Sequence, residues 1–383
     1  MNYEFHQAAN IFPMMEGQGY KDLVSDIASN GLQMPIVLHE GKILDGRNRY
    51  RACLELGLLP EFVYYEGDNP FSYVVSLNLK RRHLDESQRA MVAAKLANLT
   101  NKDNQYTVGA SIDAPISQNQ AAELLNVSRP SVQRAKQVIE HGTPELIHAV
   151  EQGEIPVSRA VKEIRSIEIK AERQAIADTA KNIEPDNRWR VYQGDVATWT
   201  APRQYDFIIT DPPYPKEFIP LYAVLAMRAN EWLTPGGLLI AMCGQSYLNE
   251  IYNIMSEHLT YYWTACYLLP GQPTPLRTRQ VNTSWKPLLI FSRSDSYKGK
   301  IFGDVFKSDG NDKDFHKWGQ SVSGMTSIIS QICLPGQYIL DPFCGAGTTG
   351  IAALAHGCLF DGLELEAENV NISKARLNDT TKA

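Results

Sequence analysis

Two short segments of the chain combine acidic residues with prolines or glycines in an order that could support chemistry. Residues 207–214 read Phe-Ile-Ile-Thr-Asp-Pro-Pro-Tyr, and residues 338–350 read Tyr-Ile-Leu-Asp-Pro-Phe-Cys-Gly-Ala-Gly-Thr-Thr-Gly. In each segment a short apolar run, which is typical of a buried strand, leads directly into an aspartate. The pattern therefore predicts two strands that carry Asp211 and Asp341 at their C-terminal ends.

The first segment predicts a rigid tip that is rich in hydrogen-bond acceptors. Pro212 and Pro213 fix φ and lack an N–H, so they expose the carbonyls of Asp211 and Pro212 instead of pairing them in a sheet. Such acceptors suit the exocyclic amine of a base, which they would make more nucleophilic, and Tyr214 could stack on a base swung out of a helix. The alternative is a rigid surface turn or a proline-rich ligand. The apolar strand that leads into the motif disfavours this alternative.

The second segment predicts a strand, a tight turn and a helix that begins near Thr348. Gly345 and Gly347 let the backbone pass close to a ligand, and the helix N-terminus offers free N–H groups. A further apolar run ends at Glu364, an acid that suits a ribose diol. An ordinary turn between a strand and a helix is the alternative, but the Asp-Pro-Phe before the glycines and the acid after them favour a cofactor site.

With these motifs in place, the chain from about Trp189 to its C-terminus resembles the S-adenosylmethionine-dependent amino-methyltransferases of DNA. Because the Asp-Pro-Pro-Tyr motif precedes the Phe-x-Gly-x-Gly motif, the order resembles the β-class of these enzymes. The resemblance implies an α/β, Rossmann-like fold with a mostly parallel, doubly wound sheet, and S-adenosylmethionine as cofactor. It also implies methyl transfer to adenine N6 or cytosine N4. Asp211 favours adenine N6, because the cytosine-N4 members usually carry serine at that position.

The resemblance assigns roles to individual residues. Asp195 would correspond to the acid near the cofactor adenine, Glu364 to the acid on its ribose, and Phe343 would pack beside the methionine end. The expected catalytic residues are Asp211, Pro212, Pro213 and Tyr214. The expected cofactor-binding residues are Asp195, Asp341, Phe343, Gly345, Gly347, Thr348 and Glu364.

Composition and charge place this core in a larger protein. A length of 383 residues predicts two or three domains. The six cysteines form no Cys-x-x-Cys pair, so we expect reduced core residues of a cytoplasmic protein. We expect no metal site, and the resemblance implies a prokaryotic or phage-encoded protein that associates with the nucleoid. We see no signal peptide and no apolar run long enough to cross a membrane.

The formal net charge of −6 does not exclude a nucleic-acid partner, because it averages over faces that never meet DNA. Residues 258–303 contain one acid, Asp295, hold the aromatics 261–263, and are expected to form part of a phosphate-contacting face. The strands at 261–269 and 286–292 could equally be ordinary sheet elements with their aromatics in the core, and the loop at 271–284 would then be the exposed part that contacts DNA. The expected DNA-binding residues within it are Arg277 and Arg279. The other basic residues of this stretch are Lys286, Arg293, Lys298 and Lys300.

The first part of the chain has a different pattern. Residues 32–57 predict two strands and then a helix, with Arg47, Arg49 and Arg51 at its N-terminus, a favourable place for a phosphate. This segment resembles the N-terminal domain of ParB-like partition proteins, which gives a small α+β domain at residues 1–99. It departs from them where they show Gly-Glu-Arg-Arg, since Arg47 and Asn48 stand there. Binding of a nucleoside triphosphate therefore stays open, and a basic surface for DNA phosphates or for an acidic partner is the alternative.

Residues 116–165 predict an all-α helix-turn-helix region. Ser117 and Ser128 are each placed to cap a helix, and Asn126 separates the two helices. The expected DNA-binding residues, on the exposed side of the second helix, are Arg129, Ser131, Gln133 and Arg134. ParB-like proteins have the same unit in the same position, although a plain helical hairpin shares the pattern.

A charged connector helix is expected at residues 166–187, with one face available to a neighbour or to a second subunit in a homodimer, and the methyltransferase domain at 188–383. Two functions compete. The chain is either a site-specific methyltransferase of double-stranded DNA, as in restriction-modification, or a ParB-like DNA-binding protein with an inactive methyltransferase fold. The intact Asp-Pro-Pro-Tyr motif favours the first.

Overall fold

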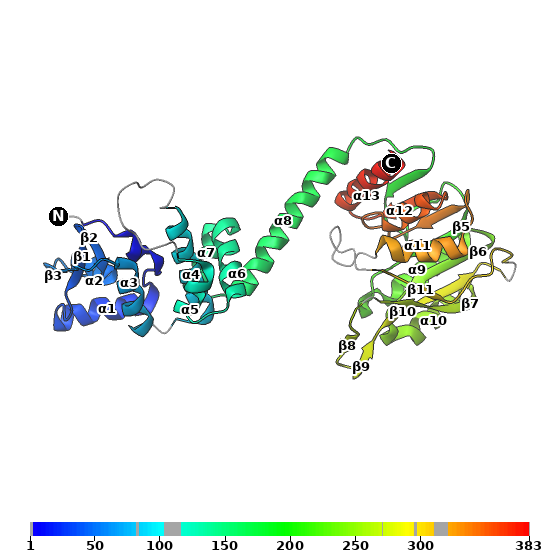
Figure 1. Cartoon of the computed structure of the whole chain (residues 1–383). Helices are drawn as coiled ribbons and strands as arrows, with labels where there is room; N and C mark the ends of the chain where they lie inside the picture. Colours follow the sequence, from blue (N-terminus) through cyan, green and yellow to red (C-terminus); the bar gives the residue numbers. More distant parts are fainter. Residues whose placement is uncertain are drawn as a thin grey trace. The chain divides into compact units, whose positions relative to one another are not determined.

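A computed structural model describes residues 3–81, 84–102, 116–269, 271–294, 297–309 and 321–382. The chain divides into two compact units, Met1–Ile167 and Glu168–Ala383 (Figure 1). Among the described residues, no helix is both long enough and apolar enough to cross a lipid bilayer.

The second unit is built on an eight-stranded sheet with the strand order β11-β7-β10-β6-β5-β12-β13-β4. Neighbouring strands are parallel except where β10 pairs with β6 and with β7, so β10 alone runs against the others. This confirms the expected α/β fold with a mostly parallel sheet. The strands are β4 (Trp189–Gln193), β5 (Tyr205–Thr210), β6 (Leu233–Met242), β7 (Thr260–Leu268), β10 (Trp285–Ser292), β11 (Val305–Lys307), β12 (Tyr338–Asp341) and β13 (Leu359–Glu364).

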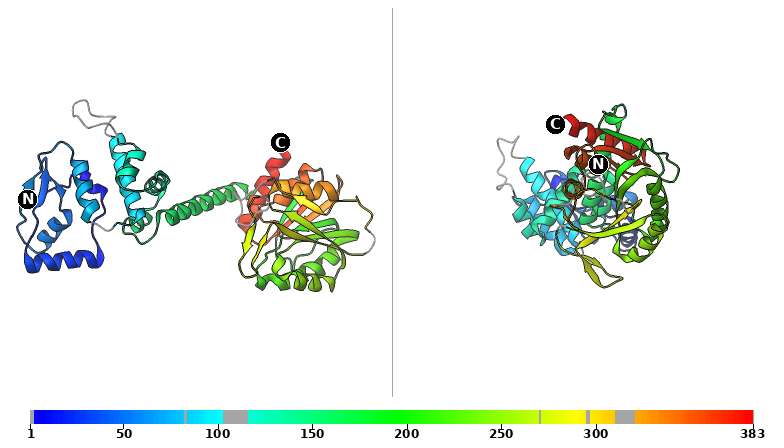
Figure 2. Two further views of the ribbon diagram at one scale, coloured as in Figure 1. Left: turned by 60° about the horizontal axis from the view of Figure 1, so that its bottom comes forward. Right: turned by 90° about the vertical axis from the view of Figure 1, so that its right-hand side faces the viewer.

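Helices cover both faces of this sheet because its central strands are apolar on both sides. In β5, Phe207 and Ile209 face one core and Ile208 faces the other. On the first face lie α11 (Val322–Ile332), α12 (Thr348–Ala355) and α13 (Ala367–Lys382); on the second lie α9 (Ile219–Trp232) and α10 (Leu248–Ser256). Figure 2 shows the orange to red helices and the green helices on opposite sides of the sheet.

A separate two-stranded hairpin, β8 (Thr274–Leu276) and β9 (Val281–Thr283), lies between β7 and β10 in the sequence. β7 ends, and β10 begins, at the edge of the sheet where the parallel strands β5, β6 and β12 end. The hairpin therefore arises from the same edge as the two motifs.

The first unit begins with a small sheet in the order β2-β1-β3, in which β1 is antiparallel to β2 and parallel to β3. Its strands are β1 (Ile36–His39), β2 (Lys42–Asp45) and β3 (Phe62–Tyr64). Around them lie a short 3-10 helix, η1 (Gln7–Ile11), and the helices α1 (Gly17–Asn30), α2 (Arg47–Glu55) and α3 (Pro70–Arg81). This is the α+β arrangement expected for the N-terminal region.

The remainder of the first unit is helical: α4 (Glu86–Lys102), α5 (Gln118–Leu124), α6 (Arg129–His141), α7 (Pro144–Glu151) and the start of α8 (Val157–Ala180). The expected caps are present. Ser117 forms a capping box with Gln120, and the Ser128 side chain accepts from the backbone N–H of Ser131. The sharp break between α5 and α6 is at Asn126, whose φ of 50° is left-handed.

The unit boundaries differ from those expected. One buried cluster joins residues of η1, α3 and α4 to residues of α5–α8, so the expected domains at 1–99 and 116–165 share a core. The connector expected at 166–187 is not a separate helix, because α8 starts at Val157 and runs across the boundary between the units. Shared apolar burial, which a sequence pattern does not reveal, determines the first boundary.

Candidate active site

The two motifs lie side by side at the edge formed by the C-terminal ends of β5, β12, β13 and β4, which we call the catalytic edge. β5 and β12 are parallel neighbours, with Phe207 opposite Ile339 and Ile208 opposite Leu340. Immediately beyond this register, the Thr210 hydroxyl donates to Oδ1 of Asp341 at 2.6 Å. A direct hydrogen bond therefore joins the strand that carries Asp-Pro-Pro-Tyr to the strand that carries the glycine turn.

Asp341 is buried and its carboxylate is bonded within the protein. Besides Thr210, the Thr349 hydroxyl donates to Oδ2 at 2.6 Å and the Phe343 N–H donates to Oδ1 at 3.1 Å. Burial raises the pKa of Asp341 to about 6, although these three donors act in the opposite direction. We expected Asp341 to bind the cofactor; the geometry makes it a residue that shapes the turn.

The glycine turn has the backbone conformation that its sequence predicts. Gly345 and Gly347 have φ values of 52° and 80°, and Gly347 is the N-cap of α12. A Cβ at Gly347 would lie 3.1 Å from the hydroxyl of Ser373, so a side chain there would be crowded as well as strained.

Two residues of α13 hold the backbone of this turn, and no sequence pattern predicts either of them. The Ser373 hydroxyl donates to the carbonyl of Gly345 at 2.7 Å, and Arg376 Nη1 donates to the carbonyl of Ala346 at 2.6 Å. Arg376 also lies 3.4 Å from the hydroxyl of Thr348. No motif marks α13, because its contribution depends on how the helix packs across the turn.

Two carboxylates lie at the ends of the next strands. Glu364, at the end of β13, accepts the Gly345 N–H at 2.9 Å and the Glu366 N–H at 3.0 Å. β13 pairs with β4, and the Gly194 N–H donates to the Glu364 carbonyl at 3.0 Å, which places the exposed Asp195 next to Glu364. Phe343 lies on the other side of the turn and is partly buried against the core.

These features fit the cofactor that the sequence predicts. The turn leaves room where side chains would otherwise project, and two acids at adjacent strand ends supply acceptors for hydroxyl and amino groups. Both acids retain lone pairs, because a carboxylate can accept about four hydrogen bonds.

The catalytic motif forms a small polar network. The hydroxyl of Tyr214 donates to Oδ1 of Asp211, and the ammonium of Lys286 donates to the same hydroxyl at 3.0 Å. Lys286 also forms an ion pair with Asp211, with Nζ 4.0 Å from Oδ2. Burial, and then the neighbouring carboxylate, raise the pKa of Tyr214 well above its usual range, so this hydroxyl keeps its proton. Pro212 is buried beside this network and Pro213 is partly exposed.

The basic stretch at 258–303 does not form one surface. Lys286 faces the catalytic edge, Arg293 donates to the carbonyl of Leu233 at 2.6 Å, and Lys300 donates to the carbonyl of Ser330 at 2.7 Å. Residues 261–263 lie near the start of β7, opposite the end of β10, and therefore at the other edge of the sheet. The cations of this stretch therefore face different parts of the protein, because alternate residues of a strand point in different directions and some cations are used internally. Phosphate contact by the exposed loop at 271–284 stays a prediction.

Arg277 and Arg279 do lie together at the catalytic edge. Both are exposed in the turn of the β8–β9 hairpin, and Arg279 donates to the carbonyl of Ser246 at 3.2 Å. The base of the hairpin is anchored where Thr283 donates to Gln245 at 3.1 Å, just beyond β6.

In the first unit, the residues expected to bind DNA lie on α6. Arg129, Gln133 and Arg134 are exposed, while Val132, Ala135 and Val138 on the other side of the helix are buried. Ser131 differs from the other three, because its hydroxyl donates to Glu86 of α4 at 3.0 Å.

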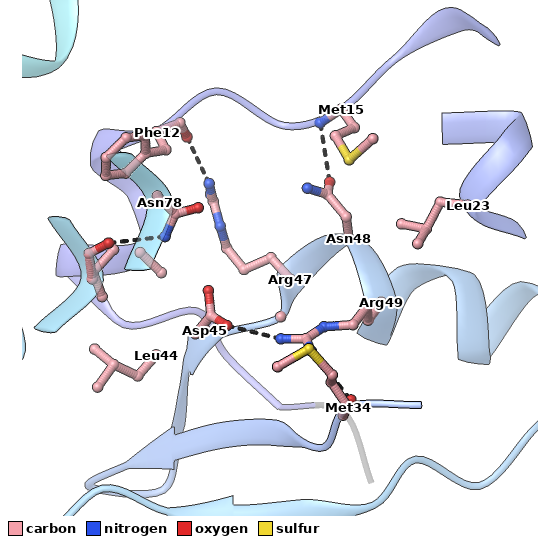
Figure 3. A pocket seen from close by; sticks show the side chains of 13 residues that line it. Phe12, Met15, Leu23, Met34, Leu44, Asp45, Arg47, Asn48, Arg49 and Asn78 are labelled. Atoms are coloured by element: carbon pink, nitrogen blue, oxygen red, sulfur yellow. Dashed lines mark hydrogen bonds and ion pairs between the residues drawn. The ribbon is translucent and has the colours of Figure 1, made fainter. Parts of the chain in front are cut away.

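The three arginines expected to bind phosphate have separate environments. A pocket of about 280 Å³, which we call the arginine pocket, lies at the N-terminus of α2 and is lined by Arg47, Arg49 and other residues. Figure 3 shows how these side chains lie. Arg47 donates to the carbonyl of Phe12 at 2.6 Å and to Asn10, and Arg49 forms an ion pair with Asp45 at 2.8 Å. Arg51 does not line this pocket, because its guanidinium lies 3.6 Å from the centre of the Tyr20 ring.

The comparisons with known proteins agree with this site. Residues 205–375 match the model of the DNA methylase family, which covers N6 and N4 enzymes. The matched residues carry both motifs, and the cofactor of this family, S-adenosylmethionine, is the one that the sequence predicts.

The chain is 24% identical over 235 residues to YubD of Escherichia coli (strain K12), a methylase by name. The aligned region covers 51% of this chain and 92% of YubD. It is 54% identical over 51 residues to the Type II methyltransferase M2.LlaDCHI of Lactococcus lactis subsp. cremoris, but these residues are 13% of this chain and 19% of that enzyme. Among solved structures, the complex of M1.HpyAVI with SAM has 25% identity and a TM-score of 0.43, over 50% of this chain and 99% of that one.

Proposed function

We propose that the chain is a DNA methyltransferase that moves a methyl group from S-adenosylmethionine to N6 of a flipped adenine. The observation that carries the proposal is the hydrogen bond from Thr210 to Asp341, because it fixes the amine-binding tip beside the turn expected to hold the cofactor. Adenine is supported by Asp211, an acid where the cytosine-N4 enzymes of the family usually carry serine.

In this proposal the chain acts by alignment. Asp211 and the carbonyl of Pro212 accept the two N–H groups of the target amine, which turns the nitrogen lone pair toward the methyl group. When bound, the cofactor supplies an electrophilic methyl on a sulfonium sulfur. A bond forms from the amine nitrogen to the methyl carbon as the sulfur–methyl bond breaks, with its electron pair remaining on sulfur. One amine proton then leaves to solvent past Asp211.

Incubation of the full chain with labelled cofactor and unmethylated DNA tests this function. We expect label in DNA and N6-methyladenine on digestion and mass spectrometry. Asp211→Ala should abolish most transfer, whereas Asp379→Ala, an exposed acid on α13, should not. Recovery of N4-methylcytosine would change the base assignment alone. Absence of label on every DNA would instead support a DNA-binding protein with an inactive methyltransferase fold.

We infer that α5 and α6 form a helix-turn-helix that gives the enzyme affinity for duplex DNA. The buried small residues Ala121 and Ala122 on α5 allow the two helices to pack closely, and the polar face of α6 is exposed. The β8–β9 hairpin, with Arg277 and Arg279 at its turn, supports a second contact beside the flipped base.

We also infer that the arginine pocket binds the phosphates of a nucleoside triphosphate. Its support is the N-terminus of α2, which follows the left-handed Gly46, together with the buried amides of Asn48 and Asn78 that line the pocket. Calorimetric titration with nucleoside triphosphates should show saturable binding that Asn48→Ala weakens and the exposed Asn30→Ala does not. A flat titration would leave the two arginines with structural roles only.

A further inference from the structure

One cation of the catalytic edge, Lys286, contacts the catalytic motif without belonging to it. Lys286 is the second residue of β10, the strand that runs against all its neighbours in the sheet. Because β10 is antiparallel, it begins where the other strands end, and its first residues lie beside Asp-Pro-Pro-Tyr. The Lys286 side chain is 22% exposed, so most of it is held within the protein.

The contacts of Lys286 link both polar side chains of the motif. Its ammonium donates to the Tyr214 hydroxyl at 3.0 Å, lies 4.0 Å from Oδ2 of Asp211, and lies 4.7 Å from the centre of the Tyr214 ring. The Tyr214 hydroxyl has one proton, which it donates to Asp211. The hydroxyl is thus held by a donor on one side and an acceptor on the other, which fixes the ring that would stack on the target base.

The sign of the charge decides what Lys286 can contribute. The amine nitrogen becomes more positive as it accepts the methyl group, and a nearby ammonium disfavours that change. An electrostatic role in stabilising the transition state is therefore excluded, and the benefit that remains is orientation. A stacked base is useful only when its amine points at the methyl group, so a small rotation of the Tyr214 ring would be costly.

We propose that Lys286 is a positioning residue, which acts through the Tyr214 hydroxyl to orient the stacking ring and the Asp211 carboxylate. This inference rests on the proposed function. When the target amine approaches Asp211, it competes with the Tyr214 hydroxyl for the carboxylate, and the bond from Lys286 keeps the hydroxyl in place during that exchange.

Steady-state methyl transfer by single and double variants tests the proposal. Lys286→Met should lower kcat about 10- to 100-fold, with KM for DNA and the Kd of S-adenosylhomocysteine within a factor of about two. Tyr214→Phe should lower kcat similarly, and the double variant should lose no more than either single one. Lys286→Arg, which keeps a donor, should recover most of the rate. Lys170→Met, an exposed lysine on α8, is the matched control.

Two kinetic outcomes would overturn the proposal: a normal kcat for Lys286→Met, or losses that multiply in the double variant. A merely structural role would instead lower cofactor affinity and thermal stability together.

A second measurement is independent of activity. Amine-directed acetylation followed by peptide mass spectrometry should modify Lys286 more slowly than Lys170, and Tyr214→Phe should accelerate modification of Lys286 alone. An unchanged rate for Lys286 in that variant would refute the contact between Lys286 and Tyr214, whether or not the unmutated chain methylates DNA. Absence of DNA methylation by the unmutated chain would refute the proposed function separately.

Discussion

The catalytic edge and the arginine pocket both place charged side chains beside a helix that follows a left-handed glycine, Gly347 in one and Gly46 in the other. At the catalytic edge the carboxylates of Asp211, Asp195 and Glu364 come from the ends of separate strands, where the ligands are expected to bind. In the arginine pocket, Arg47 and Arg49 come from one helix turn and donate to acceptors of their own unit. The comparison teaches that strand order brings dispersed residues to a ligand, whereas a cluster of charges in sequence is as readily used to hold the fold.

The strongest test of the comparison concerns Asp341, a buried acid of the catalytic edge whose carboxylate accepts three hydrogen bonds from the protein. Its pKa is raised from 3.8 to about 6, so between these values the folded state keeps a proton that the unfolded state releases. Its contribution to stability therefore falls as pH rises from 4 to 6, by about 3 kcal/mol in all at 1.36 kcal/mol per unit. Asp341→Asn lacks this dependence and should gain stability relative to the unmutated chain over that range.

Urea unfolding at a series of pH values measures this difference. All six tryptophans lie in the second unit, so tryptophan fluorescence reports that unit specifically. A difference between the two proteins that stays constant from pH 4 to pH 7 would show that Asp341 is ionised throughout, and that its three donors outweigh burial.

The second prediction concerns Glu364, an acid of the same edge that is expected to meet the ligand. Glu364→Ala removes the acceptor for the Gly345 N–H and for a ribose hydroxyl, and hydrogen bonds to a charged group contribute about 1.5–3 kcal/mol. We expect the Kd of S-adenosylhomocysteine to rise roughly 10- to 100-fold by calorimetry. Glu257→Ala, an exposed acid beyond α10, should leave it unchanged. Equal affinities for the two variants would remove Glu364 from the cofactor site.

The third prediction addresses the arginines of the first unit. Arg47→Met leaves the buried carbonyl of Phe12 without this donor and should destabilise the first unit by about 1–3 kcal/mol. Arg51→Met, which removes a partly exposed contact with Tyr20, should cost less than about 1 kcal/mol. Thermal unfolding followed by circular dichroism measures both, and unchanged tryptophan fluorescence serves as the internal control. A larger loss for Arg51→Met would reverse the assignment of roles.

The contrast between residues at strand ends and residues placed by packing explains which parts of the site the sequence could predict. Asp211 and Asp341 each follow an apolar strand, and parallel strands end at one edge, so their proximity follows from pattern and fold class. Lys286 could not be placed in this way, because it lies at the start of β10, a strand whose reversed direction is not visible in its composition. The partners of Arg47 lie 35 and 37 residues upstream, in a segment without a motif. Sequence patterns indicate where a strand ends. Which side chains meet beyond that end depends on packing between distant segments.

The smallest expected effect concerns α6, whose exposed charged residues are expected to contact DNA. Arg134 is exposed on the polar side of this helix and is expected to contact a DNA phosphate. Arg134→Ala should weaken binding of duplex DNA several-fold at about 0.1 M salt and reduce the slope of log K against log salt by about one. Arg165→Ala, an exposed arginine on α8 of the same unit, should change neither quantity. If both variants lower the slope equally, the first unit attracts DNA through its general charge and α5 and α6 form a plain helical hairpin. If only Arg134→Ala lowers it, α6 is a region of the first unit where charge is kept for DNA.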